Sequence, residues 1–180
     1  MNLVAIQGIR GSYSEEAARK MFGEKAEILE CLSFEETFEA VLSKRAKFAL
    51  VPVNNKIVGE IKSATSILKR TNLKILDELP LKIQHVLIGT NDAQVEKVEM
   101  ICSHEEALKQ CRKFLAENVA WQTIIGGDTA SCVRRIIEER SATGAAIGSR
   151  RAAEIYGGKI LKENIADDLE NVTTFYLISN

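Results

Sequence analysis

Residues 7–20, QGIRGSYSEEAARK, place two glycines and one arginine between a strand-like run and a helix-like run. Glycine lets backbone N–H groups approach a ligand closely, and the N-terminal end of a helix favours negative charge. The segment therefore fits two interpretations, a tight turn that caps a helix or a site for an anion. In the second interpretation Arg10 is a candidate partner of the bound anion.

Other common sites of α/β proteins are not supported by the motifs. The glycine loop is neither G-x-x-x-x-G-K-[ST] nor G-x-G-x-x-G, which excludes the usual nucleotide triphosphate and dinucleotide sites. His85 and His104 have no carboxylate or cysteine partner at metal-ligand spacing. Both histidines are expected to be structural, and no metal site is predicted.

The four cysteines, Cys31, Cys102, Cys111 and Cys132, are widely spaced and form no C-x-x-C pair. This spacing argues against a zinc knuckle and against a disulfide framework. Reduced and mostly buried thiols are therefore predicted. Cys111 stands at helical spacing beside apolar neighbours, so its expected role is packing.

Composition limits the partners of this chain. The 180 residues are 46% hydrophobic and carry a net charge of -1. No cluster of Lys and Arg is interleaved with aromatic residues, so nucleic acid is not an expected partner. No signal peptide and no run long enough to span a membrane are found, so a cytoplasmic protein without membrane contacts is expected.

Apolar strand-like runs alternate with helix-period segments along the chain, which is typical of βαβ units with parallel sheets. The alternation restarts after residue 99, so two lobes of similar build are predicted. The loops that follow the strands carry hydroxyls, amides and a few cations, which suits a small polar acid as ligand. A last alternating run, NVTTFYLIS, is expected to return and pair with a sheet.

Eight segments, taken in order, resemble the successive motifs of the prephenate dehydratase catalytic domain. They are GIRGSYSEEAA, FEETFEAV, VPVNNKIVGEI, KIQHVLIG, SHEEALKQC, DTASC, AAIGSRRAAEIYG and NVTTFYLI. The resemblance covers residues 1–180 as a single domain and implies a two-lobed α/β fold, similar to type II periplasmic binding proteins, with the active site in a central cleft. The first lobe would take about 1–80 plus about 166–180, and the second about 81–165. The regulatory domain usual in the family is not expected.

The central motif of this family is Asn-x-Thr-Arg-Phe, whose threonine gives a proton to the departing hydroxyl and whose arginine holds a substrate carboxylate. Here the motif is NVTTF, so the resemblance implies Thr173 as the catalytic donor, while Thr174 replaces the arginine. A second motif, Pro-Val-Glu-Asn-Ser, is PVNNK in this chain and ends in Lys56. It has lost a carboxylate and gained a cation, so Lys56 or Arg10 is the candidate replacement for the missing arginine.

By the same resemblance the substrate is prephenate, a small dicarboxylate. The reaction releases carbon dioxide and hydroxide to give phenylpyruvate, in phenylalanine biosynthesis. Aromatisation drives it, so no metal or organic cofactor is expected. Further candidate substrate-binding residues that the resemblance implies are Ser12, Tyr13, Asn55, Ser103, Thr129, Asn171 and Phe175.

Three functions remain open. The retained Thr173 favours dehydration, whereas the altered VNNK and TTF stretches favour a related branch that decarboxylates prephenate without aromatising it, in secondary metabolism. The third function is a binding module for a small carboxylate without catalysis. The family also implies a homodimer or a larger assembly.

Overall fold

The computed structural model describes residues 3–180, which divide into two compact units. The first unit contains residues up to Ile9, Tyr13–Ile83 and Glu170–Asn180, and the second contains Arg10–Ser12 and Gln84–Leu169. The chain therefore passes between the units near residues 83 and 169, and residues 10–12 form a short excursion from the first unit into the second.

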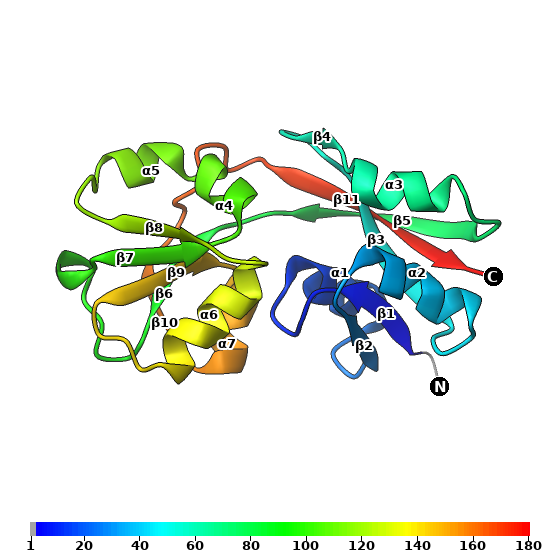
Figure 1. The fold of residues 1–180 in the computed structure, drawn as a ribbon, viewed down its shortest axis with the longest axis horizontal. Helices are drawn as coiled ribbons and strands as arrows, with labels where there is room; N and C mark the ends of the chain where they lie inside the picture. The colour runs from blue at the N-terminus through cyan, green and yellow to red at the C-terminus, as the bar shows by residue number, and fades with distance from the viewer. Residues whose placement is uncertain (1–2) are drawn as a thin grey trace. The chain divides into compact units, whose positions relative to one another are not determined.

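The first unit is a six-stranded sheet with helices on both faces (Figure 1). The strand order is β2-β1-β3-β11-β5, and β4 pairs with β3. Strands β1, β2 and β3 are parallel, whereas β11 runs antiparallel to both β3 and β5. Its elements are β1 (Val4–Gln7), α1 (Tyr13–Phe22), β2 (Ile28–Cys31), α2 (Phe34–Leu42), β3 (Phe48–Asn55), β4 (Gly59–Glu60), α3 (Lys62–Leu68), β5 (Lys74–Lys82) and β11 (Val172–Ser179).

The second unit is a five-stranded sheet in the order β10-β6-β9-β7-β8. Strand β7 is parallel to β8 and β9, whereas β6 is antiparallel to β9 and β10. Its elements are β6 (Val86–Gly89), the 3-10 helix η1 (Val95–Lys97), β7 (Met100–Ser103), α4 (Glu105–Gln110), α5 (Arg112–Ala116), β8 (Gln122–Ile125), α6 (Thr129–Glu138), β9 (Gly144–Gly148), α7 (Arg150–Tyr156) and β10 (Lys159–Lys162).

Both sheets are mixed, so the prediction of parallel sheets is wrong in part. Parallel neighbours need a crossover helix, and the parallel strands of each unit are indeed joined through helices. Strand β11 instead arrives from the second unit and enters the first sheet between β3 and β5 in the opposite direction. The prediction that NVTTFYLIS returns to pair with a sheet is confirmed.

Polar residues fix the starts of several helices. Ser33 caps α2 by accepting a hydrogen bond from the Glu36 backbone N–H, Asp128 caps α6 and Ser149 caps α7 in the same way. Helix α7 ends at Gly157, which has a φ of 72° and so occupies the left-handed region that glycine adopts readily. The caps at Asp128 and Ser149 fix the residues at which α6 and α7 begin. Thr129, a candidate site residue, is the first residue of α6.

Candidate active site

Three of the predicted site residues form one buried hydrogen-bonded group in the first unit. The side-chain amide of Asn55 donates from Nδ2 to Thr173 Oγ1 at 2.8 Å and to Asn171 Oδ1 at 2.9 Å. Asn55, Asn171 and Thr173 are 6%, 1% and 7% exposed. Buried polar side chains are costly unless they are satisfied, so the three residues stabilise one another. We call them the Asn55 group.

Strand pairing brings these residues together from distant parts of the chain. Thr173 on β11 lies directly opposite Asn55, the last residue of β3. Asn171 precedes β11, and its carbonyl accepts a hydrogen bond from the Ile83 backbone N–H at 2.9 Å. The group therefore sits at the end of the two central strands, with its backbone held on both sides.

The orientation of the Asn55 amide follows from its backbone partners. Asn55 Oδ1 accepts hydrogen bonds from the N–H groups of Ile57 at 2.9 Å and Val58 at 3.1 Å. An atom that receives two N–H donors must be the carbonyl oxygen, so the NH2 group faces Thr173. Thr173 Oγ1 therefore accepts from Asn55, and the hydroxyl proton of Thr173 is not used in that bond. A hydroxyl that accepts a hydrogen bond is also a stronger donor.

Phe175 and Tyr13 belong to the hydrophobic core of the first unit. Phe175 is 2% exposed and shares a cluster with Leu81 and Ile83, and Tyr13 is half-buried against the same cluster. Phe175 and Thr173 lie on the same face of β11, because side chains alternate along a strand. The structure thus brings both aromatic residues to the face that carries Thr173, with Phe175 fully packed.

Thr174 and Lys56 lie differently from the Asn55 group. Thr174 is half-buried and, by strand alternation, faces away from Thr173. Lys56 is exposed, and its Nζ donates to the Glu170 carbonyl at 3.3 Å. The structure does not bring either side chain into the hydrogen-bonded group.

In the second unit, the predicted glycine loop rests on helix α7. Ser149 Oγ donates to the Gly11 carbonyl at 2.7 Å, and the Tyr156 hydroxyl donates to the Arg10 carbonyl at 2.6 Å. Gly11 has a φ of 86°, and a Cβ there would lie 2.9 Å from the Cα of Ala152. Only glycine fits this close approach. Ser149 and Tyr156 were not predicted, although a serine directly before a helix is a recognisable capping signal.

The remaining predicted residues of the second unit take different positions. The Arg10 side chain is exposed, and Ser12 is buried in the same short excursion. Ser103 ends β7, is fully buried and donates from Oγ to the Ile147 carbonyl at 2.7 Å. Thr129 is half-buried at the start of α6. Ser103 and Thr129 thus follow the carboxyl ends of the parallel strands β7 and β8, where ligands of α/β sheets bind.

The two histidines have structural surroundings. His104 caps α4, its Nδ1 accepting from the Glu106 backbone N–H at 3.2 Å. His85 is 3% exposed, and its Nε2 lies 2.9 Å from Gln110 Oε1. Burial lowers the pKa of His85, with the hydrogen bond to Gln110 opposing the shift. The pair joins two of the family-like segments, and neither spacing nor composition predicted it.

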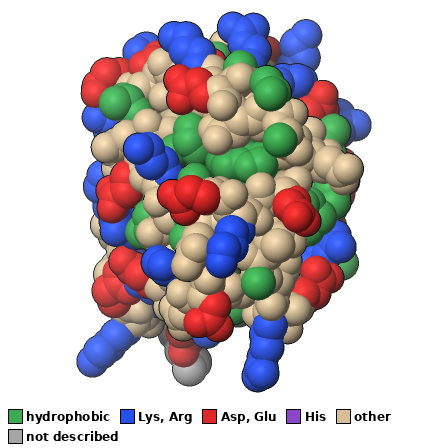
Figure 2. Space-filling model, turned by 90° about the vertical axis from the view of Figure 1, so that its left-hand side faces the viewer, with side chains coloured by type: hydrophobic (Ala, Val, Ile, Leu, Met, Phe, Trp, Pro, Cys, Tyr) green, Lys and Arg blue, Asp and Glu red, His purple; other side chains and the backbone are tan. Residues whose placement is uncertain are grey.

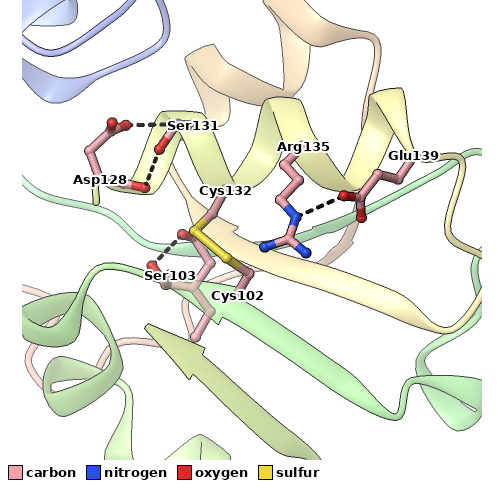
Figure 3. The surroundings of a disulfide bond; sticks show 8 residues. Cys102, Ser103, Asp128, Ser131, Cys132, Arg135 and Glu139 are labelled. Atoms are coloured by element: carbon pink, nitrogen blue, oxygen red, sulfur yellow. Dashed lines mark hydrogen bonds and ion pairs between the residues drawn. A yellow bond between two sulfur atoms is a disulfide. The ribbon is translucent and has the colours of Figure 1, made fainter. Parts of the chain in front are cut away.

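Two of the four cysteines are not reduced thiols, contrary to the prediction. Cys102 on β7 and Cys132 on α6 form a disulfide bond with a Cα–Cα distance of 5.5 Å (Figure 3). The prediction of reduced thiols is therefore wrong for this pair, because a separation of 30 residues in sequence hides their proximity in the fold. Cys31 and Cys111 are free and buried, as predicted. Burial, with a smaller contribution from Asp167, raises the pKa of Cys111 to about 12.

Within residues 3–180, no three His, Cys, Asp or Glu side chains gather where they could hold a metal ion.

A pocket of about 510 Å³ opens in the first unit at the end of β11 near Ser179, and none of the predicted site residues lines it. On the face shown in Figure 2, Lys and Arg side chains are interspersed with Asp and Glu. None of the helices in the described part of the chain is long and apolar enough to cross a bilayer.

Known proteins match this chain over almost its full length. A family model described as prephenate dehydratase matches residues 4–180. "Arogenate dehydratase/prephenate dehydratase 2, chloroplastic" of Arabidopsis thaliana is 35% identical over 98% of the chain. "Bifunctional chorismate mutase/prephenate dehydratase" of Buchnera aphidicola subsp. Schizaphis graminum is 32% identical over 96% of it.

A solved structure of a prephenate dehydratase is also similar to this chain. The prephenate dehydratase of Arthrobacter aurescens in complex with L-Phe matches with a TM-score of 0.91 and 25% identity, over 99% of this chain and 60% of that one. The matched part is 46% of each of the two curated relatives named above. The chain thus spans about half the length of the curated relatives that it matches.

Proposed function

Because the chain belongs to the prephenate dehydratase family, we propose that it is a lyase that converts prephenate to phenylpyruvate, in phenylalanine biosynthesis. One relative is named as a dehydratase of both arogenate and prephenate, so arogenate is the alternative substrate to test beside prephenate. The family signal covers the chain from residue 4 to its last residue, and Thr173, the residue matching the family's proton donor, lies in the Asn55 group.

In the proposed reaction, the ring carbon that carries the carboxylate loses carbon dioxide. The electron pair of the broken C–C bond moves into the ring, and the ring hydroxyl leaves from the opposite carbon. Thr173 stabilises that departing oxygen by sharing its hydroxyl proton with it. The oxygen leaves as hydroxide, which takes a proton from solvent, so Thr173 keeps its own proton at the end of the step. The protein's contribution is positioning and a proton donor, since aromatisation supplies the driving force.

One observation carries this assignment, the orientation of the Asn55 amide. A threonine hydroxyl has too high a pKa to give up its proton fully, so it acts as a donor only when other groups support it. Asn55 supplies that support at 2.8 Å from Thr173 Oγ1, and its own orientation is fixed by the backbone N–H groups of Ile57 and Val58. The hydroxyl proton of Thr173 then remains available for substrate.

The other predicted residues are proposed as substrate contacts. We assign Asn171 and Tyr13 in the first unit, and Ser12, Ser103 and Thr129 in the second, to positioning of the substrate. Lys56 and Arg10 are proposed as partners of a substrate carboxylate in place of the family arginine. A homodimer or larger assembly is also proposed, and a solution mass equal to one chain, measured by light scattering, would contradict it.

The test is product identification with the purified protein. Prephenate is incubated with the protein, alkali is added, and the ultraviolet absorbance of phenylpyruvate is read, with carbon dioxide release measured in parallel. The proposal predicts phenylpyruvate and carbon dioxide in equal amounts. A parallel incubation with arogenate, whose aromatised product is phenylalanine, identifies the preferred substrate. Binding of prephenate without release of either product would instead identify a binding module.

A second candidate function, decarboxylation without aromatisation, is favoured by one observation. Thr174 stands where the family has an arginine. In the second motif the family Glu-Asn-Ser is replaced by Asn54, Asn55 and Lys56, so only the middle asparagine is kept. In that chemistry the ring hydroxyl is retained. The same assay would then give carbon dioxide without an equal amount of phenylpyruvate.

A further inference from the structure

We propose that Cys102 and Cys132 are a reversible redox site that controls how the second unit binds substrate. The proposal rests on the proposed function, because it concerns Ser103 and Thr129, which are assigned there to substrate positioning. In the oxidised state the disulfide ties the end of β7 to the first turns of α6 (Figure 3). In the reduced state this tie is lost.

The disulfide lies close in sequence to both candidate contacts. Cys102 is the residue before Ser103, and Cys132 is three residues after Thr129. Both cysteines are 2% exposed, and their Cα–Cα distance of 5.5 Å is typical of a disulfide. A change at the sulfur atoms therefore acts on the backbone that carries Ser103 and Thr129.

The turn between β8 and α6 packs on the two sulfur atoms without a side chain in between. A Cβ on Gly126 would lie 2.3 Å from the Sγ of Cys132 and 3.3 Å from the Sγ of Cys102. The Gly126 backbone N–H also donates to the Ser103 carbonyl at 2.8 Å. The next residue, Gly127, is exposed, so the disulfide lies one glycine turn below the protein surface.

Reduction removes the covalent link between β7 and α6. The Gly126 turn packs directly on both sulfur atoms, so a movement of either sulfur displaces that turn. The turn is bonded to the Ser103 carbonyl through the Gly126 N–H and leads into the Asp128 cap of α6, so Ser103 and Thr129 move with it.

The chemistry is ordinary thiol–disulfide exchange. Oxidation converts the two thiols of Cys102 and Cys132 to one disulfide, while a small-molecule disulfide such as glutathione disulfide takes up two electrons and two protons and leaves as two thiols. Reduction by a dithiol reverses the step. Cys31 and Cys111 are free and buried, and burial raises the pKa of both, to about 12 for Cys111.

The test uses the whole chain in two verified redox states. The protein is equilibrated with glutathione disulfide or with a phosphine reductant, and each state is checked by intact mass after alkylation in denaturant. The oxidised state is expected to take up two alkyl groups, on Cys31 and Cys111, and the reduced state four. Steady-state kinetics with prephenate and amide hydrogen exchange of residues 126–131 are then measured on both states.

Reduction is expected to raise KM about three- to tenfold, the effect of one weakened hydrogen bond, with kcat nearly unchanged. Exchange in residues 126–131 should become faster, and reoxidation should restore both values. Cys132→Ser and Cys102→Ser should each show the reduced-state KM in both buffers. Cys31→Ala, a matched change of a buried free cysteine in the first unit, should keep the full redox response.

The outcomes separate this proposal from the proposed function. Equal KM and equal exchange in the two verified states would overturn the redox proposal, as would two alkyl groups in both states or four in both. Absence of turnover of prephenate and arogenate in both states would overturn the proposed function instead. Hydrogen exchange alone then decides the redox proposal, with faster exchange on reduction supporting it and unchanged exchange overturning it.

Discussion

Asn55 donates a hydrogen bond to Thr173 across two neighbouring antiparallel strands, and two backbone N–H groups fix which end of the Asn55 amide makes that bond. The direction of this hydrogen bond decides whether the Thr173 proton is available to substrate. Since Asn55 is the donor, Thr173 keeps its own proton for a different acceptor. A buried amide therefore acts as a positioning group for the hydroxyl that is assigned to catalysis.

Reversing this hydrogen bond should reduce catalysis without unfolding the protein. In Asn55→Asp, one carboxylate oxygen can still accept from Ile57 and Val58, but the other faces Thr173 and accepts its proton. The Asn171 amide, whose Oδ1 accepts from Asn55 in the parent protein, then has to turn and present its NH2 group. We expect kcat for phenylpyruvate formation to fall by about 10² or more at neutral pH, the usual contribution of a positioned proton donor. Steady-state kinetics give the result, with circular dichroism as the check on folding.

The matched control for this change is Asn54→Asp. Asn54 precedes Asn55 on β3 and is exposed, so the same added charge lies on the other side of the strand. This variant should keep the parent kcat. Equal kcat values for Asn55→Asp and the parent protein would remove Asn55 from the mechanism.

Lys56→Ser tests the replacement for the missing family arginine. If Lys56 holds a substrate carboxylate, KM should rise severalfold while the thermal midpoint stays within the range of surface substitutions. Lys82→Ser is the matched control, since Lys82 also contacts Glu170, through an exposed ion pair of 2.7 Å. The same KM change in both variants would show that Lys56 acts through Glu170 and not on substrate.

A buried ion pair in the first unit gives a prediction on stability. Arg19 Nε contacts the carboxylate of Glu15 at 2.9 Å, the Glu15 side chain is fully buried, and Arg19 also donates to the carbonyls of Glu24 and Ala26. Arg19→Ala leaves a buried carboxylate without this cation, and we expect the free energy of unfolding to fall by about 3–5 kcal/mol. Urea denaturation measures the change.

Helix α6 offers a control with the same spacing. Arg135 and Glu139 form an i,i+4 pair of 2.8 Å, but both side chains are about half exposed. Arg135→Ala should cost no more than about 0.5 kcal/mol, because water already solvates both charges. Similar losses in the two variants would contradict the importance of burial at Glu15.

His85 should make the protein less stable in mild acid. Burial lowers the pKa of His85 in the folded state from 6.5, so below about pH 6.5 the unfolded chain binds a proton that the folded protein does not. The free energy of unfolding should therefore fall with pH below that value, by at most about 1.4 kcal/mol per pH unit from this group. His85→Gln should show a shallower fall between pH 6.5 and 5.

Urea unfolding at several pH values measures both proteins. Identical slopes for His85→Gln and the parent would show that His85 does not contribute.

Local signals in the sequence predicted most of the elements but not their long-range pairing. The apolar runs that became β1, β3 and β11 were recognised, and the predicted α/β fold, similar to type II periplasmic binding proteins, is confirmed by the likeness to the Arthrobacter aurescens enzyme. The mixed sheets were missed, because local periodicity does not report the direction in which a strand enters a sheet.

The same limit applies to the candidate site. Asn55 and Thr173 were both predicted, but they are 118 residues apart in sequence, so their register and the direction of their hydrogen bond come only from the fold. The Cys102–Cys132 disulfide was missed for the same reason. Ser149 and Tyr156, which hold the glycine loop, act from 138 and 146 residues away from it.

The most direct measurement of the central claim is phenylpyruvate formation from prephenate by Thr173→Val. Valine has nearly the shape of threonine but no hydroxyl, so the account predicts that phenylpyruvate formation is lost while prephenate binding, measured by calorimetry, persists. Thr174→Val, on the opposite face of β11, should still form phenylpyruvate. Formation of phenylpyruvate by Thr173→Val at the parental rate would contradict the assignment of Thr173 as the catalytic proton donor.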